Sequence, residues 1–317
     1  MASDTVCGVT DRVPVVDGLA RGVAPAFGAG LFLGLAPASA LAGWWLVAGL
    51  VLAAALAVLF ALSTSDSTPG TAALSLGILG RIAAAVAVAG TFGRYVVPEQ
   101  PAVGAVALVV AVGAVVLLAP PLPSAVDRIA AVVVLVVLVV VGVACFTIAP
   151  VAPPVAPVPD TAGSDAPLGL LPCAAVLFVC FVGGQTTRKL RPAVIGVVLV
   201  VSVGVAVGAL RQLGGERLAL SPAPLRDVLT AADASSIDGL LAAGVTVACA
   251  FALRACFTDI RDIAPGNRSP VAAVGLAAGV AALGALVLNA EHALVGAAVL
   301  LLGEAVIRVL TGRTRRA

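Results

Sequence analysis

Long apolar runs separated by short polar stretches dominate the pattern of hydrophobic and polar positions along the chain. Each run is about 18 to 26 residues long, close to the ~20 residues with which a helix crosses the hydrocarbon core of a bilayer. The pattern therefore predicts an all-α integral membrane protein with about ten transmembrane helices. The ten runs are residues 18–42, 43–62, 72–97, 102–119, 129–149, 167–187, 193–210, 237–256, 270–289 and 293–310.

The segments between these runs contain the charges, prolines and glycines that typically end a helix. Between the first two runs the Ala-rich sequence hides the turn, which we place near Gly43. The expected loops are residues 63–71, 98–101, 120–123, 150–165, 188–192, 211–236 and 259–269.

Composition supports this class, because 61% of the residues are hydrophobic, 11% are charged and the mean hydropathy is +1.18. Such values are typical of integral membrane proteins and exclude a soluble globular domain. The net charge of +2 points to no charged partner such as nucleic acid. Five of the six cysteines lie in or beside apolar runs. We interpret them as small apolar packing residues rather than a disulfide framework or a zinc site.

Basic residues are distributed unevenly over alternate loops, and positive charge is usually retained on the cytoplasmic side. With a cytoplasmic N-terminus, only four of the 18 Lys and Arg residues face outward, namely Arg94, Arg211, Arg217 and Arg226. The sequence therefore predicts a multi-pass protein of the plasma (inner) membrane with both termini in the cytoplasm. Residues 1–17 carry acidic residues and no apolar core, so they predict a cytoplasmic leader rather than a signal peptide.

The first run differs from a plain lipid-spanning helix because glycine and proline are spread through it. Pro25 and Pro37 flank a stretch that contains Gly28, Gly30 and Gly34. Glycine has a high entropic cost inside a helix, and proline removes one of its hydrogen bonds. We therefore expect the helix to break at Gly28 to Gly30, which frees backbone groups at membrane depth. Such groups are tolerated there only when they are buried in protein or line a polar cavity, as in secondary transporters.

Two motifs resemble those of the amino acid/polyamine/organocation (APC) superfamily of permeases. The sequence Gly-Ala-Gly-Leu-Phe at 28–32 is similar to the family's first-span motif Gly-(Ser/Ala)-Gly-Ile-Phe, and residues 35–38 and 42–45 resemble an actinobacterial branch. Residues 178–185 are similar to the sixth-span pattern Phe-x-x-Phe-x-Gly-x-(Glu/Gln), and Arg-Pro-Ala at 191–193 resembles the loop that follows. The resemblance implies a shortened ten-span member with a LeuT-like five-plus-five inverted repeat and broken helices 1 and 6.

The resemblance also implies how the chain is divided. A first five-helix repeat would cover residues 18–149 and a second would cover residues 167–310. A proline-rich outer loop at 150–166 would join them. Residues 1–17 and 311–317 would form the cytoplasmic leader and a basic cytoplasmic tail.

The expected break would give the first span a substrate site made of backbone groups. The half-helix starting at Leu31 would point free amides at a substrate carboxylate, whereas the carbonyls of residues 25–27 suit an ammonium group or a cation. Phe178 and Phe181, three residues apart on one helix face, would form a wall over the substrate. In the APC family these positions bind the α-amino and α-carboxyl groups of the substrate and gate the outer side. The candidate substrate-binding residues are Pro25, Ala26, Phe27, Gly28, Ala29, Gly30, Leu31, Phe32, Phe178, Phe181, Gly183, Gly184 and Gln185.

Packing interpretations stay open for the same residues. Gly28 and Gly30 would also suit close helix packing of small residues. Phe178 and Phe181 would also suit core or lipid-facing packing. Thr246 in the eighth span could help to coordinate a cation, or it could hydrogen-bond to its own helix.

Ionisable residues inside the spans are further candidates for function. Arg81, Arg128 and Arg254 lie near expected cytoplasmic helix ends, where a long side chain can extend to the membrane surface. Glu304 and Arg308 are four residues apart and are expected to pair along the last span.

On the outer side, Arg94 and its neighbour Tyr95 could face a vestibule or anchor the third span at the interface. His292, the only histidine, is expected in an exposed outer turn beside Glu291. A role as a proton relay is the alternative for this residue.

We therefore expect a secondary active transporter that moves an amino acid or related small amine across the bilayer by alternating access. No motif indicates an enzyme or a cofactor. The coupling ion, H⁺ or Na⁺, stays open, because the fifth span has no lysine to replace a sodium ion.

Two other functions stay open. A degenerate permease-fold protein could act as a partner or scaffold for another protein without transport. Two departures from the family motivate this alternative: only Thr-Pro-Gly-Thr at 68–71 remains of a longer segment before the third span, and the two further C-terminal spans of many members are absent. The other alternative is a ten-span drug/metabolite-type transporter, whose first and sixth helices would not be broken.

Overall fold

The structure, a computed structural model, describes residues 15–63, 70–118, 122–148, 169–182, 190–263 and 270–314, which are almost entirely helical. Each of the ten apolar runs falls on a helix, so the predicted all-helical class is confirmed. The α-helices are α1 (Val15–Ala42), α2 (Leu46–Ser63), α3 (Thr71–Val96), α4 (Pro101–Leu118), α5 (Ser124–Thr147), α6 (Leu170–Val182), α7 (Arg191–Leu220), α8 (Pro224–Ala231), α9 (Asp238–Ile263), α10 (Pro270–Val287) and α11 (Ala290–Thr314). Two 3₁₀ turns, η1 (Gly43–Trp45) and η3 (Ser235–Ile237), precede α2 and α9.

The apolar surface of the bundle is that of a membrane protein. Leu118, Val200 and Leu276 are 85%, 73% and 66% exposed, and a large apolar surface of this kind suits lipid rather than water. Two apolar helices, α6 and residues 271–287 of α10, are shorter than a full span, so the number of crossings stays a prediction. Seven stretches of the described chain are helical, long and apolar enough to cross a membrane: Gly30–Leu62, Thr71–Val96, Pro101–Leu118, Ser124–Thr147, Arg191–Leu220, Asp238–Ile263 and Ala290–Thr311.

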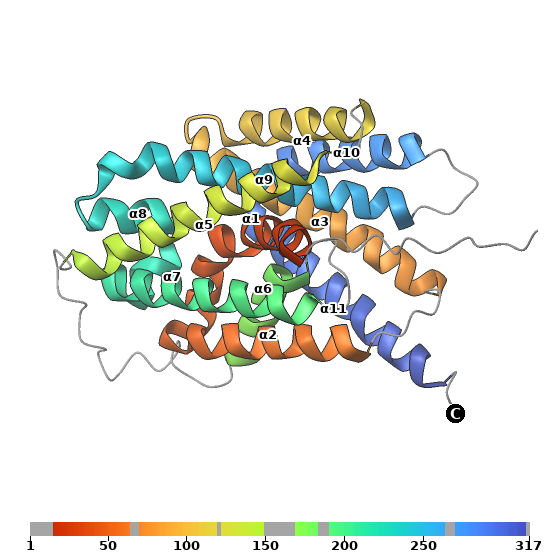
Figure 1. The fold of residues 1–317 in the computed structure, drawn as a ribbon, viewed down its shortest axis with the longest axis horizontal. Coiled ribbons are helices and arrows are strands. Elements are labelled where there is room, and N and C mark those ends of the chain that lie inside the picture. The colour runs from red at the N-terminus through yellow and green to blue at the C-terminus, as the bar shows by residue number, and fades with distance from the viewer. Residues whose placement is uncertain are drawn as a thin grey trace, which may run out of the picture.

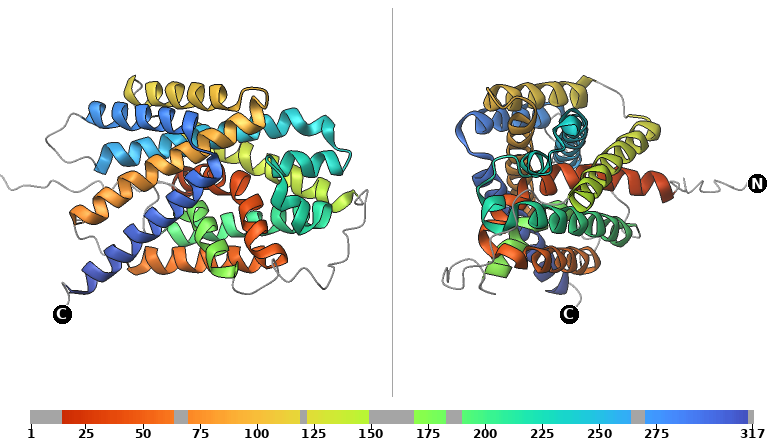
Figure 2. Two further views of the ribbon diagram at one scale, coloured as in Figure 1. Left: turned by 180° about the vertical axis from the view of Figure 1, so that it is seen from behind. Right: turned by 90° about the vertical axis from the view of Figure 1, so that its left-hand side faces the viewer.

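α1 is the central element of the bundle and packs against α5, α6, α7 and α9 (Figure 1). It is helical without interruption along its whole length, so the predicted break at Gly28 to Gly30 is wrong. The two parts of α1 nevertheless run in different directions (Figure 2). Pro25 and Pro37 lie inside the helix, and a proline bends a helix because it lacks the amide that the next turn requires. The helix is therefore bent rather than broken.

An interruption does occur in α7, at Gly214. Its backbone angles, φ 74° and ψ 167°, are accessible to glycine without strain. Beside it, the carbonyl of Gly215 accepts a 2.8 Å hydrogen bond from Oγ of Ser39 in α1. Helical structure then continues to Leu220, and α8 follows it. Residues 211–236, which we expected to form a loop, are thus mostly helical.

α3 and α11 lie side by side in antiparallel directions (Figure 2). Arg81 in α3 pairs with Glu304 in α11 at 3.0 Å, and Arg94 pairs with Glu291 at 2.9 Å. From the first pair to the second, the chain advances thirteen residues along α3, from 81 to 94, and goes back thirteen residues along α11, from 304 to 291. Equal spacing in opposite directions is what two antiparallel helices require. Gly77 of α3 lies directly against Glu304, which shows how closely the two helices approach.

The helices before and after residue 150 pack in corresponding pairs. In this correspondence α1 matches α6, α2 matches α7, α3 matches α9, α4 matches α10 and α5 matches α11. The matching pairs are α1 on α7 with α6 on α2, α1 on α5 with α6 on α11, α3 on α4 with α9 on α10, and α4 on α9 with α10 on α3. Exceptions include the packing of α1 on α2, α3 and α9, because the described part of α6 does not pack comparably on α7, α9 and α3.

Candidate functional site

The glycines of the first-span motif make close contacts between helices. A side chain added at Gly28 would overlap the backbone carbonyl of Ala248 in α9, and one added at Gly30 would overlap Cys180 in α6. Small residues at such positions let helices approach closely in a membrane. Because α1 is helical here, the amides after Gly30 bond to carbonyls of the same helix. The predicted carboxylate site at Leu31 is therefore wrong.

The other α1 residues of the predicted site belong mainly to the core. Ala29 is part of the same continuous helix. Pro25 lines a small cavity of about 30 Å³ between α1, α3, α6, α9 and α11. Four residues of the predicted α1 site, Ala26, Phe27, Leu31 and Phe32, are at most 1% exposed.

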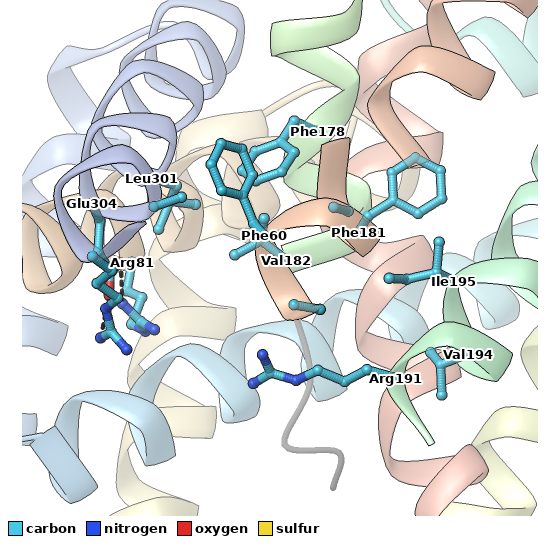
Figure 3. Close-up of a pocket in the computed structure, with 14 residues that line it drawn as sticks. Phe60, Arg81, Phe178, Phe181, Val182, Arg191, Val194, Ile195, Leu301 and Glu304 are labelled. Atoms are coloured by element: carbon cyan, nitrogen blue, oxygen red, sulfur yellow. Dashed lines mark hydrogen bonds and ion pairs between the residues drawn. The ribbon is translucent and has the colours of Figure 1, made fainter. Parts of the chain in front are cut away.

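The aromatic pair of the predicted site lines a larger cavity of about 140 Å³ between α2, α3, α6, α7 and α11. Phe178 and Phe181 in α6 are 2% and 8% exposed. The Phe178 ring packs edge-to-face on Phe60 of α2, with ring centroids 5.7 Å apart. Figure 3 shows the three rings on one side of the cavity, with Ile195 of α7 near Phe181. This wall is aromatic and aliphatic.

The opposite wall carries a network of charged side chains. Arg81 donates from Nε to Asp259 Oδ2 at 3.2 Å and from Nη1 to Glu304 Oε2 at 3.0 Å. It also donates to the Gly77 carbonyl at 2.9 Å. The other oxygen of Glu304, Oε1, lies 2.5 Å from Arg308 Nη2, which confirms the pairing expected along the last span. Each oxygen of this buried carboxylate therefore has a cationic partner, as burial of a charge requires.

The wall of the cavity also carries one arginine whose charge no described carboxylate compensates. Arg191, the first residue of α7, lines the cavity and forms no ion pair with any other described residue. Nε of Arg308 is buried and has no hydrogen-bond partner in that part of the chain. In Figure 3 the Arg191 guanidinium extends from α7 toward the side where Arg81 and Glu304 lie. The cavity thus combines an apolar wall with a basic one.

A second charged cluster holds the beginning of α1. Asp127 at the start of α5, with a side chain only 5% exposed, accepts hydrogen bonds from Arg21 Nε at 3.2 Å and Arg254 Nη1 at 2.7 Å. Arg128 pairs with Asp17 at 2.8 Å. Arg254, like Arg81 in the cavity network, forms ion pairs with carboxylates of neighbouring helices, and its expected extension to the membrane surface stays a prediction. Both turn to buried carboxylates, which would otherwise be unpaired charges.

Tyr95, at the end of α3 far from Arg81, connects α1 to α8. Its hydroxyl donates to the Phe32 carbonyl at 3.2 Å and accepts from the Leu225 amide at 3.1 Å. The neighbouring Arg94 pairs with Glu291. Glu291 and His292 are exposed, as expected, but they lie in the first turn of α11.

The contacts of individual residues bear on several other sequence predictions. Thr246 Oγ1 donates to the Ala242 carbonyl at 2.7 Å, so it bonds to its own helix. Cys145, Cys173, Cys180 and Cys249 are buried in the helices, as apolar packing residues would be. Gly183, Gly184 and Gln185, with the expected break in the sixth span, lie outside the described residues.

Comparison of the chain with models of known protein families and with curated proteins finds no match. The candidate site therefore rests on geometry. Sequence reasoning missed Phe60, Asp259 and Arg191 as parts of one site. The charges of Arg81, Asp259 and Glu304 inside or beside apolar runs were the available signal, because ionisable groups at membrane depth need partners.

Proposed function

We propose that the protein is a secondary transporter of the APC type, with a LeuT-like fold, which moves a small organic solute across the plasma membrane by alternating access. The observation that carries this proposal is the cavity of about 140 Å³ inside a bundle of apolar helices. Pockets with mostly apolar walls and a few convergent polar groups are typical of small-molecule sites. The aromatic pair contributed by α6 is the part of the expected site that lines this cavity.

The corresponding helix pairs support an inverted repeat. Contacts that recur when one set of five helices is exchanged for the other are expected of two structurally similar halves. Five helices is an odd number, so the second half would be inverted in the membrane relative to the first. Transporters of this kind place their substrate between such halves and expose it to each side in turn.

The distribution of packing supports a state that is closed on one side. α8 and Tyr95 cover α1 at one end of α3, whereas the cavity reaches exposed Arg191 at the start of α7. If both termini are cytoplasmic, as the basic residues predict, the covered end faces outward. The cavity then belongs to an inward-facing state.

A scaffold without transport is the second candidate, and one observation favours it. α1 is continuous, and α9 and α6 occupy the space beside Gly28 and Gly30. A protein that had lost its transport site could keep such a core unchanged. The two functions differ in whether solute crosses the membrane.

Uptake by proteoliposomes tests the proposal. Purified protein would be reconstituted and offered labelled amino acids, amines and organic acids under imposed proton and sodium gradients. The transporter predicts saturable, protein-dependent accumulation of at least one solute. Accumulation equal to that of protein-free liposomes for every solute would contradict the proposal and favour the scaffold.

A further inference from the structure

We propose that the cavity binds a small organic carboxylate with an aromatic-sized apolar group, and that Arg191 and Arg308 hold the carboxylate while no ammonium group is required. This inference specifies the substrate class of the proposed transporter and so rests on the proposed function. It differs from the amine or amino acid expected from the sequence, because it places recognition on two arginines instead of the α1 backbone.

The available charge in the cavity is positive. Arg191 has no ion-pair partner among the described side chains. Arg308 pairs with Glu304 through Nη2, and its side chain, which is 33% exposed, also lines the cavity. Guanidinium groups bind carboxylates through short, charge-assisted hydrogen bonds. An anion is therefore the ligand that would compensate Arg191 and that Arg308 also favours.

The acidic groups near the cavity are already engaged. Glu304 is the only carboxylate among the described lining residues, and its two oxygens face Arg81 and Arg308. Asp259 accepts from Arg81 on the other side of the network. An ammonium group would have to displace an arginine to reach either carboxylate. Binding of an amine is thus disfavoured by the same contacts that hold the helices together.

The apolar wall sets the size of the remaining part of the ligand. The cavity volume of about 140 Å³ is close to that of engineered apolar cavities of ~150 Å³ that bind benzene. Phe60, Phe178 and Phe181 supply aromatic faces and edges on this side. A phenyl or branched aliphatic group would fill the space, with its carboxylate directed to the basic wall.

Three probes of nearly equal shape test this inference: 3-phenylpropionate, L-phenylalanine and phenethylamine. Binding to the purified full-length protein in detergent would be measured by calorimetry and by ligand-induced thermal stabilisation. We expect 3-phenylpropionate to bind at least as tightly as L-phenylalanine, and phenethylamine to bind at least tenfold more weakly. Tighter binding of phenethylamine, or no binding of 3-phenylpropionate, would overturn the inference.

Arg191→Gln is the matched variant, because it removes the guanidinium without breaking an ion pair in the described structure. We expect it to weaken 3-phenylpropionate binding about tenfold or more while the melting temperature of the ligand-free protein is unchanged. Arg261→Gln is the control, since Arg261 in α9 lies outside the cavity and its one ion pair among the described residues is with Asp262, at 3.7 Å. Equal affinities for wild type and Arg191→Gln would contradict the assignment.

Two further outcomes separate this inference from the proposed function. Binding that depends on Arg191 without any uptake supports the carboxylate site and contradicts transport. Uptake of amines that is unaffected by Arg191→Gln supports transport and contradicts the site. An anionic lipid is another source of such an anion. Stabilisation by phosphatidylglycerol, lost in Arg191→Gln, with none by 3-phenylpropionate, would identify a lipid site and overturn the inference.

Discussion

At the scale of single residues, Arg81 has the most consequential contacts. It joins three helices, because its own helix α3 is tied through it to Asp259 in α9 and Glu304 in α11. Its side chain is 16% exposed and that of Glu304 is 7% exposed. Removing one partner of such a buried pair leaves charges uncompensated, and this costs more than the pair contributes when it is intact.

Arg81→Met should therefore lower the free energy of unfolding by about 3 kcal/mol. Arg94→Met is the matched control, since it breaks the other pair between the same two helices. Its partner Glu291 is 49% exposed, so the loss should stay below about 1 kcal/mol. Unfolding titrations of both variants in mixed micelles would measure the difference. Equal losses would show that the cavity network is not a structural clamp.

Gly30 offers a second test at this scale. A methyl group there would overlap Cys180, and overpacking of a helix contact typically costs about 1–3 kcal/mol. Gly30→Ala should reduce the thermal stability of the protein, whereas Gly142→Ala should not, because nothing lies within 4 Å of a methyl group at Gly142. Comparable melting temperatures for the two variants would mean that Gly30 is not a packing contact.

At the scale of helices, the apolar runs were sufficient to place the long elements, because membrane spans must be long and apolar. The state of α1 could not be predicted in this way. Glycine suits a break as well as a close contact, and the contacts that decide between them come from Ala248 and Cys180, more than a hundred residues away. The same limit hid the cavity network, whose arginine and carboxylates lie on three separate helices.

α8 shows a signal that was present in the sequence but was outweighed by charge. The segment 211–236 contains Arg211, Glu216 and Arg217, which indicated a loop. Leu225, Val228 and Leu229 nevertheless recur at helical spacing, and all three are fully buried. Pro224 stands in the first turn of α8, where proline is favoured.

Tyr95→Phe should loosen α8. The Leu225 amide lies in the first turn of α8, where no carbonyl of the same helix is available to it, and the Tyr95 hydroxyl is its acceptor. Without that hydroxyl, amides in residues 224–231 should exchange with solvent faster in hydrogen-exchange mass spectrometry. Peptides from α4 should exchange as in the wild type. Unchanged exchange in α8 would show that the hydroxyl does not hold it.

At the scale of the whole molecule, one charged cluster and one tyrosine hydroxyl hold α1 to its neighbours, and α6, which packs on α1, lines the cavity. Asp127 ties α1 to α5 and α9, and Tyr95 ties it to α8. A transporter would have to release one of these connections to change the side on which the cavity opens. The cavity should then be the path of the solute as well as its binding site.

Blocking the cavity tests this claim most directly. Ala57 lines it from α2 and is 6% exposed, so Ala57→Phe would fill the space. Val200→Phe adds a similar volume at a side chain that is 73% exposed on α7, outside the cavity. Uptake of labelled 3-phenylpropionate and L-phenylalanine by proteoliposomes is predicted for the wild type and Val200→Phe, and should be lost in Ala57→Phe. No protein-dependent uptake of either solute, or wild-type uptake by Ala57→Phe, would contradict the account.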